Sequence, residues 1–171
     1  MSIISFLISL YFLVGFGPID KNEEIFTIYL VRHSEKTSNY SFTKDIPLSK
    51  CGQQRSEALS RFLNDIHLDA IYSTDYTRTI NTALPTAHLK GIEITLYNTE
   101  NLKSLSKTLL DKRQDALVIG HSNTTGVLAG LLANDEIEDI DLDVYDHIYQ
   151  LVICGKSRRL NLFKSSFKCD T

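Results

Sequence analysis

Four polar residues stand directly after, or shortly after, short apolar runs in this chain of 171 residues: Arg32, His33, Arg78 and His121. Each run has the length and the apolar or β-branched composition of a buried strand. Parallel strands end at the same edge of a sheet, where the ligands of α/β proteins bind. We therefore predict that the four side chains meet in one crevice, although they are far apart in the sequence.

Two guanidinium groups and two imidazole rings that meet in a partly dry crevice repel one another unless an anion lies between them. Arginine keeps its charge at any working pH, and its paired N–H donors match the oxygens of a phosphate group. These residue types predict a site for a phosphoryl group that is held by Arg32, Arg78 and His121.

His33 is the candidate for reaction with that phosphoryl group. Neighbouring cations are expected to lower the histidine pKa values, so that an imidazole stays neutral and nucleophilic near pH 7. A hydrogen bond from one ring nitrogen to a backbone carbonyl would leave the lone pair of the other nitrogen directed at phosphorus. Attack would form a phosphohistidine intermediate, which water then hydrolyses. Positioning and electrostatic stabilisation do most of the work in such a transfer.

The segments that carry these residues occur in the order found in a known family. They are LVRHSEK at 30–36, PLSKCGQQRSEAL at 47–59, IYSTDYTRTINTA at 71–83 and LVIGHSNT at 117–124. Together they resemble the histidine phosphatase superfamily, also called phosphoglycerate-mutase-like, over most of residues 25–155. Ser34 stands where the family usually has glycine, and this variant is similar to the Arg-His-Ala-Glu-Lys segment of small phosphatases in the family.

The resemblance implies a phosphatase that works without a metal ion or an organic cofactor. It implies that His33 is the nucleophile, that Arg32 and Arg78 contact the phosphate, and that His121 is a further contact that stabilises the transferring group. We expect the substrate to be a small phosphorylated molecule or a phosphoprotein, with hydrolysis of a phosphomonoester or of phosphohistidine.

Two other functions stay open at this point. Phosphoglycerate-mutase-like phosphoryl transfer uses the same chemistry, but the long insertions of the larger family members have no room in this chain. A module that binds a phosphate ligand without turnover would use the same pocket, although binding alone requires no neutral nucleophile.

The proton donor to the leaving group is not fixed by the resemblance. Family members usually supply a Glu or an Asp for this role, and some lack it. Glu100 lies in about the expected region, with Glu35 and Asp75 as rivals.

The rest of the chain predicts helices that alternate with strands. Ser49 can cap a helix whose apolar positions recur every three or four residues, namely Leu59, Phe62, Leu63 and Ile66. A second helix is expected at 75–89, bent or ended by Pro85. Two more are expected at 102–110, capped by Asn101, and at 127–133.

Six strands are predicted, at 25–31, 70–73, 92–97, 116–119, 148–154 and 160–163. Their alternation with helices predicts an α/β fold, a three-layer α/β/α sandwich with a mostly parallel central sheet. The acidic segment at 134–143 has no spaced ligand pattern for a cation and is expected to be a solvated loop.

The composition indicates one folded domain and argues against a nucleic-acid partner. Lys and Arg number 18 against 21 Asp and Glu, which gives a formal net charge of -3. Binding to a nucleic-acid backbone rests on clustered Lys and Arg, which this chain lacks.

Residues 1–17 carry no charge and consist mainly of Ile, Leu, Phe and Val. The run is short for a membrane-spanning helix and near the upper size of the apolar region of a signal peptide. We therefore expect residues 1–20 to be a signal peptide or an N-terminal membrane anchor, and 21–171 to be the phosphatase domain. The protein would then be exported or periplasmic, with membrane association through residues 1–17 left open. A buried first element of the domain is the alternative.

Three cysteines, Cys51, Cys154 and Cys169, lack the paired spacing of a metal site. Outside the cytoplasm Cys154 and Cys169 could pair across adjacent C-terminal segments. Buried thiols are the alternative.

Overall fold

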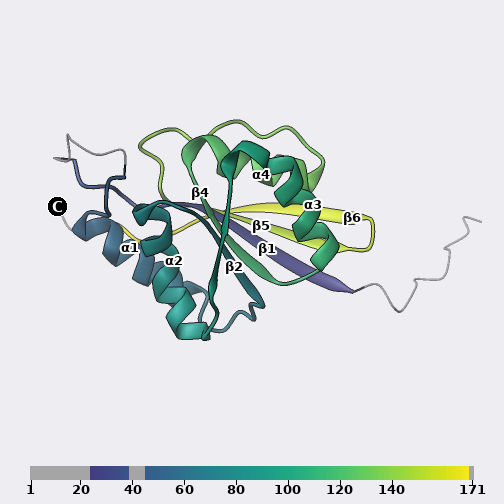
Figure 1. The fold of residues 1–171 in the computed structure, drawn as a ribbon, viewed down its shortest axis with the longest axis horizontal. Helices are drawn as coiled ribbons and strands as arrows, with labels where there is room; N and C mark the ends of the chain where they lie inside the picture. The colour runs from purple at the N-terminus through teal and green to yellow at the C-terminus, as the bar shows by residue number, and fades with distance from the viewer. Residues whose placement is uncertain (1–23, 39–44, 170–171) are drawn as a thin grey trace, which may run out of the picture.

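The computed structural model describes residues 24–38 and 45–169, which form one six-stranded sheet with helices on both faces (Figure 1). The strands are β1 (Ile25–Arg32), β2 (Ala70–Thr74), β3 (Ile94–Tyr97), β4 (Ala116–Gly120), β5 (His147–Cys154) and β6 (Ser157–Lys164). The helices are α1 (Lys50–Phe62), α2 (Thr77–Lys90), α3 (Leu102–Lys112) and α4 (Ser122–Ala133), with a 3-10 turn η1 (Thr99–Asn101) before α3.

The sheet has the order β3-β2-β4-β1-β5-β6. The first four strands in this order are parallel, and β5 and β6 form an antiparallel hairpin that is added beside β1. All five residues of β4 are buried, as the wholly apolar run predicted for a central strand. The carboxyl ends of β1, β2 and β4 therefore lie side by side.

Two hydrophobic cores separate the sheet from its helices. On one face Leu63, Ala83 and Ala87 from the region of α1 and α2 pack against the sheet. On the other face α3 and α4 contribute Leu105, Leu109, Leu128 and Leu132. Figure 1 shows α1 and α2 together on one side of the strands and α3 and α4 on the other. The predicted three-layer α/β/α sandwich with a mostly parallel sheet is confirmed.

Helix α1 begins after Ser49 as predicted, but not all of the apolar positions predicted to face the core are buried. The Ser49 hydroxyl oxygen accepts a hydrogen bond from the backbone nitrogen of Gly52 at 3.0 Å. Leu63 is fully buried, whereas Phe62 is 48% exposed. Successive residues of a helix point about 100° apart, so Phe62 cannot share the buried face with the residue that follows it.

Two other helices depart from their predicted bounds. Pro85 lies inside α2 and does not end it, because the helix continues to Lys90 and closes on Gly91 in the left-handed conformation. Helix α4 begins at Ser122, five residues earlier than predicted. The side-chain oxygen of Thr124 accepts a hydrogen bond from the backbone nitrogen of His121 at 2.8 Å and so caps the helix there.

A disulfide joins Cys51 in α1 with Cys169, 118 residues away along the chain. Neither of the two alternatives considered for Cys169, a bond to Cys154 or a buried thiol, matches the structure. Cys154 lies at the turn of the β5–β6 hairpin, opposite Ser157. Strand β6 then runs away from this turn, and residues 165–169 continue to the start of α1 at the opposite end of the sheet.

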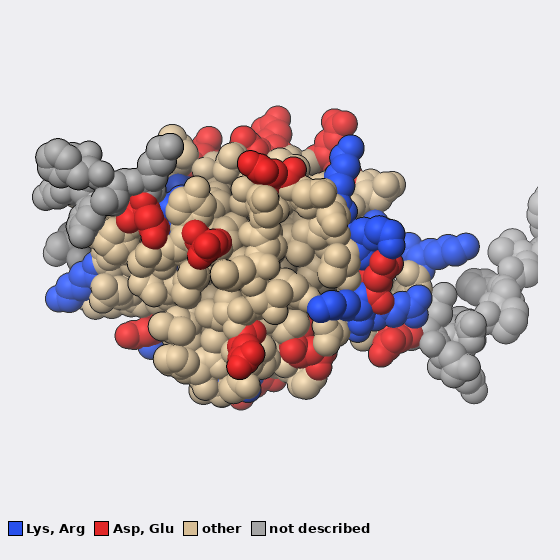
Figure 2. All heavy atoms as spheres, viewed as in Figure 1, with Lys and Arg blue, Asp and Glu red and all other residues tan. Residues whose placement is uncertain are grey.

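The signal peptide or anchor predicted for residues 1–20 lies outside the described residues. Within 24–38 and 45–169 no helix combines the length and the apolar character that crossing a membrane requires. Figure 2 shows Lys and Arg mainly toward the end of the molecule at which the β5–β6 hairpin turns, with Asp and Glu among them.

Candidate active site

A cavity of about 290 Å³ opens at the carboxyl ends of β1, β2 and β4. It is lined by Arg32, His33, Lys36, Tyr76, Arg78, Thr99, His121, Ser122, Asn123, Thr124 and Leu142. The four side chains predicted to converge are thus brought together. The register of the sheet brings the two histidines together. Arg32 at the end of β1 pairs with Gly120 at the end of β4, and the residue that follows each of these strands is a histidine. The two imidazole rings lie 5.4 Å apart, centroid to centroid.

The ring of His33 is fixed by a hydrogen bond to the backbone of the next residue. Its Nδ1 atom lies 2.8 Å from the carbonyl oxygen of Ser34. A carbonyl oxygen can only accept, so Nδ1 carries the proton and Nε2 keeps its lone pair. The backbone nitrogen of His33 donates to the carbonyl of Gly120 at 2.9 Å, which ties the residue to β4. His33 is only 4% exposed, so little solvent competes with these contacts.

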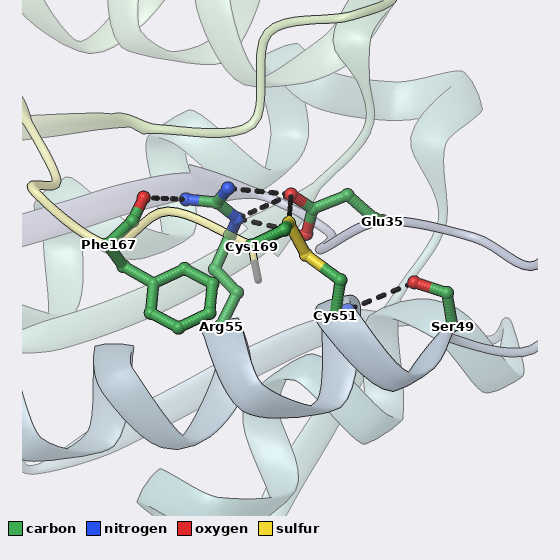
Figure 3. The surroundings of a disulfide bond; sticks show 7 residues. Glu35, Ser49, Cys51, Arg55, Phe167 and Cys169 are labelled. Carbon is green, nitrogen blue, oxygen red and sulfur yellow. Dashed lines mark hydrogen bonds and ion pairs between the residues drawn. A yellow bond between two sulfur atoms is a disulfide. The ribbon is translucent and has the colours of Figure 1, made fainter. Parts of the chain in front are cut away.

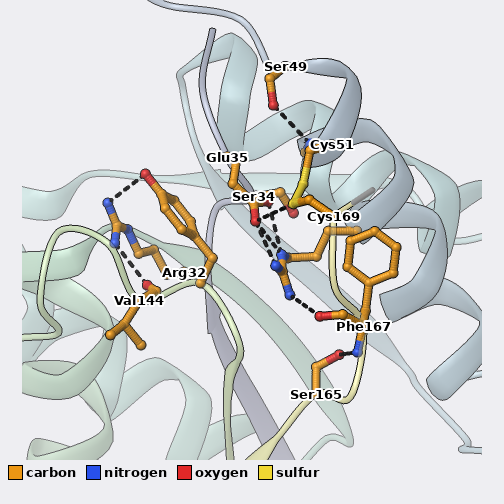
Figure 4. Close-up of polar contacts among 12 residues, drawn as sticks. Arg32, Ser34, Glu35, Ser49, Cys51, Val144, Ser165, Phe167 and Cys169 are labelled. Atoms are coloured by element: carbon orange, nitrogen blue, oxygen red, sulfur yellow. Dashed lines mark hydrogen bonds and ion pairs between the residues drawn. A yellow bond between two sulfur atoms is a disulfide. The ribbon is translucent and has the colours of Figure 1, made fainter. Parts of the chain in front are cut away.

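Arg32 is oriented by backbone carbonyls of the loop that precedes β5. Its Nη1 donates to the carbonyls of Asp141 and Val144, each at 2.9 Å, and its Nη2 donates to the Tyr145 hydroxyl at 3.3 Å. The guanidinium also lies 4.0 Å from the centre of the Tyr145 ring. Figure 4 shows Arg32 beside the carbonyl of Val144. Part of the segment expected to be a solvated acidic loop therefore holds a cation, through its backbone.

Arg78 lies in the first turn of α2 and is held by the Tyr76 ring and by Asp45. Its guanidinium is 4.3 Å from the centre of the Tyr76 ring, and its Nη1 is 3.8 Å from a carboxylate oxygen of Asp45. Asp45 also accepts hydrogen bonds from the backbone nitrogen and the hydroxyl of Thr77, at 2.9 and 2.6 Å. The same carboxylate thus caps α2 and restrains the arginine.

His121 makes a hydrogen bond at each ring nitrogen. The Nη2 of Arg78 lies 3.4 Å from its Nδ1, and the hydroxyl of Thr74 lies 3.0 Å from its Nε2. A guanidinium can only donate, so Nδ1 is the acceptor and Nε2 carries the proton. The ring is neutral in this arrangement and links the ends of β2, β4 and α2.

The Nε atoms of Arg32 and Arg78 are buried and have no hydrogen-bond partner among the described residues. Buried polar groups in folded proteins are normally paired, and an unpaired charged donor is costly. Ser122, Asn123 and Thr124 add the N-terminus of α4, where backbone N–H groups favour negative charge. The cavity is therefore built to receive an anion with several oxygens.

The pKa values of both imidazoles are lowered. Burial is the largest cause for His33, followed by the positive charges of Arg32 and Arg78, and its pKa falls to about 3 although the Ser34 hydrogen bond opposes the shift. Burial and then Arg78 lower the pKa of His121 to about 4. The direction matches the sequence prediction, but removal from water outweighs the neighbouring cations that the prediction relied on.

Among the described residues, no Asp or Glu lines the cavity. Glu100 follows Thr99, which does line it, but its side chain is exposed and its backbone nitrogen donates to Asn98. Glu100 and Asp75 both border an adjoining depression of about 450 Å³, which shares Tyr76 and Thr99 with the cavity. The Glu35 carboxylate binds Arg55 of α1 instead. The structure thus brings none of the three proposed proton donors into the lining formed by Arg32, His33, Arg78 and His121.

The sequence did not single out four residues that contribute to the site, namely Lys36, Thr74, Tyr76 and Tyr145. Tyr76 and Lys36 line the cavity, while Thr74 and Tyr145 hold His121 and Arg32. Tyr76 and Thr74 do flank Arg78 within the segment 71–83, so their proximity to that residue was the available clue.

The lowered pKa of His33 predicts that its ring stays neutral in the free protein from pH 8 down to pH 5. Unfolded histidine has a pKa near 6.5, so the unfolded chain binds the proton first as the pH falls. This site therefore costs stability progressively between about pH 6.5 and the folded pKa near 3.

Imidazole NMR of the labelled protein tests this, with the His33 signals assigned by their loss in His33→Asn. The urea-unfolded chain is the control and should titrate near pH 6.5. A His33 inflection between pH 6 and 7 in the folded protein would contradict the assignment.

Comparison with known proteins agrees with the fold and the motifs. Residues 28–105 match the profile of the histidine phosphatase superfamily (branch 1). Over 71 residues the chain is 38% identical to phosphoserine phosphatase 1 of Hydrogenobacter thermophilus, a match that covers 39% of this chain and 34% of that relative.

Two solved structures share the fold at low sequence identity. The protein histidine phosphatase SixA in complex with tungstate superimposes with a TM-score of 0.66 at 12% identity, covering 81% of this chain and 96% of that one. An α-ribazole-5'-phosphate phosphatase from Escherichia coli, described as putative, gives a TM-score of 0.69 at 15% identity, covering 82% and 96%. The matched segment, the sheet order and the convergence of Arg32, His33, Arg78 and His121 make this chain similar to the histidine phosphatase superfamily.

Proposed function

We propose that the protein is a phosphatase that hydrolyses a phosphomonoester or a phosphohistidine through a phosphohistidine intermediate on His33. One observation carries the proposal. A buried, neutral imidazole with its Nδ1 proton held by Ser34 lines the same cavity as two arginines whose Nε–H groups have no partner within the described part of the chain. A nucleophile and an oxyanion clamp are thereby combined in one site.

The reaction follows from these positions. Nε2 of His33 attacks phosphorus and forms an N–P bond while the bond between phosphorus and the leaving group breaks. Arg32 and Arg78 hold the non-bridging oxygens, and the N-terminus of α4 adds further N–H donors. Water then attacks the phosphohistidine, which releases inorganic phosphate and restores the imidazole. His121 keeps Arg78 aligned, because its Nδ1 accepts a hydrogen bond from the Arg78 guanidinium.

Related proteins support this proposal. Tungstate is an oxyanion of similar shape to phosphate, and the SixA structure contains it. The relatives described above include a phosphoserine phosphatase, an α-ribazole-5'-phosphate phosphatase and a protein histidine phosphatase. These substrates differ in all but the phosphoryl group.

Replacement of His33 by alanine should abolish hydrolysis of an aryl phosphate, with kcat reduced at least about 10³-fold. Rapid quenching of the wild-type protein with a radiolabelled aryl phosphate should trap acid-labile phosphate on His33. His67→Ala is the matched control, because His67 is exposed and pairs with Asp69 outside the cavity. Equal rates for His33→Ala and the wild-type protein would remove the catalytic role. A chelator in all assays tests the proposed independence of metal ions, which predicts unchanged rates.

The cavity's lack of a carboxylic acid among the described residues predicts a strong preference for good leaving groups. A positioned acid contributes about 10²–10⁴-fold where the leaving oxygen needs a proton. Aryl phosphates depart without one, and the imidazole of phosphohistidine can take its proton from water near neutral pH. We therefore expect kcat/KM for alkyl phosphates to lie at least about 100-fold below that for aryl phosphates and phosphohistidine peptides.

Glu100→Gln and Asp75→Asn should leave this pattern unchanged, since both side chains border the other depression. If Glu100→Gln lowered alkyl phosphate hydrolysis 100-fold and spared aryl phosphates, Glu100 would be the proton donor after all.

We also propose that the domain works outside the cytoplasm. The uncharged run at 1–17 and the Cys51–Cys169 disulfide support this, because disulfides persist in oxidising compartments. Fractionation of cells that express the full chain should recover it outside the cytoplasm with this bond formed. Recovery of the full-length chain entirely in the cytoplasm, with both thiols reduced, would contradict the proposal.

A further inference from the structure

Glu35, two residues beyond the nucleophile, forms a close ion pair with Arg55 of α1. The Nε of Arg55 donates to both carboxylate oxygens at 2.8 and 2.9 Å, and its Nη2 donates to Oε1 at 2.6 Å. The side chains of Arg55 and Glu35 are 13% and 18% exposed. A largely buried pair of this kind keeps one geometry, because losing either partner leaves an uncompensated charge.

The C-terminal segment covers this ion pair, as Figure 3 shows. The Nη1 of Arg55 donates to the carbonyl of Phe167 at 3.4 Å, and its guanidinium lies 4.9 Å from the centre of the Phe167 ring. The Sγ of Cys169 lies 3.5 Å from Oε1 of Glu35, and its disulfide to Cys51 joins the segment to α1. The bond therefore holds in place the residues that shield the ion pair from water.

The backbone of Glu35 is held as firmly as its side chain. Its carbonyl accepts the backbone N–H of Ser49 at 2.9 Å. A Cβ on Gly52 would lie only 2.2 Å from the same carbonyl oxygen, so α1 packs directly on this peptide. On the other side, the backbone nitrogen of Ser34 donates to the hydroxyl of Thr82 in α2 at 3.0 Å.

These contacts converge on the carbonyl that orients His33. The Ser34 carbonyl belongs to the planar peptide that joins Ser34 to Glu35, so its direction is set by the orientation of that peptide. Thr82 restrains one end of the unit and Arg55 the other. If the Glu35 end rotated, the carbonyl would turn away from Nδ1 of His33, and the tautomer would no longer be specified.

We propose that Glu35 and Arg55, covered by the C-terminal segment that the Cys51–Cys169 disulfide ties to α1, are positioning residues that hold the Ser34 carbonyl against His33. They keep the proton on Nδ1 and leave Nε2 as the nucleophile. This role rests on the proposed function, and it makes the efficiency of the nucleophile depend on the disulfide. The phosphate clamp of Arg32 and Arg78 has other partners and is not part of this arrangement.

The test uses Glu35→Gln and wild-type protein treated with a reductant. Steady-state hydrolysis of an aryl phosphate gives kcat and KM, and imidazole nitrogen NMR reports the His33 tautomer. For Glu35→Gln we expect kcat to fall between about 10-fold and about 100-fold, the cost of a small misplacement of a reacting group. KM should stay within about twofold, because the arginines are untouched, and the His33 nitrogens should move toward averaged tautomer shifts. The reduced wild-type protein should move in the same direction by a smaller amount.

Matched controls separate positioning from a general loss of stability. Asp111→Asn removes an exposed ion pair with Lys107 on α3 and should change neither readout. Cys154→Ser leaves the Cys51–Cys169 bond intact and should respond to reductant as the wild type does. Arg55→Lys, which still supplies a cation but not the fork of donors, should retain more activity than Arg55→Met.

Unchanged kcat and a single His33 tautomer in folded Glu35→Gln would overturn the proposal. If that variant does not fold, the reduced wild-type protein decides, and unchanged kcat with unchanged His33 signals overturns it. If the oxidised wild-type protein neither hydrolyses aryl phosphates nor traps phosphate, the proposed function fails. The tautomer comparison still tests the positioning role in that case.

Discussion

The hydrogen bond from Nδ1 of His33 to the carbonyl of Ser34 decides what this site can do. Without it, a neutral imidazole shares its proton between two nitrogens, and either could face the cavity. With it, the lone pair is confined to Nε2. The surrounding structure supports this bond. β1 ends at the residue before His33, and β4 accepts the His33 backbone N–H. Thr82 of α2 and the start of α1 hold the peptides on either side of the one that presents the carbonyl.

Burial of the site has two effects that act in the same direction. Removing His33 and His121 from water lowers their pKa values, which keeps both rings neutral. It also strengthens the attraction between the arginines and an incoming oxyanion, because the local dielectric is low. The cations alone would have lowered the pKa values less. The cost is borne by the folded state, which must hold uncharged imidazoles beside fixed positive charges.

The sequence predicted the convergence of the four main side chains because they follow strands directly or within a few residues. A parallel sheet brings such positions to one edge whatever the intervening chain does, and the register of β1 with β4 did the rest. The partners of Arg32 could not be predicted in this way, because two of them are backbone carbonyls, which every residue type provides. The disulfide was missed for a related reason. The pairing of Cys51 with Cys169 depends on the path of the chain after β6, and spacing along the sequence says nothing about that path.

The distribution of carboxylates explains how so many cations can gather around one cavity in the free protein. Asp45 contacts Arg78 from the side of α2, whereas Arg32 donates hydrogen bonds to the Tyr145 hydroxyl and to two backbone carbonyls. The Glu35 carboxylate is directed away to Arg55. Acidic groups thus hold the residues around the cavity in place, and none of them is among the described residues that line it. An acid inside the cavity would pair with the arginines and compete with the substrate. Because the acids lie outside the lining, the phosphoryl group supplies the negative charge in the cavity. The same arrangement leaves no carboxylic acid among the described lining residues to donate a proton to the leaving group.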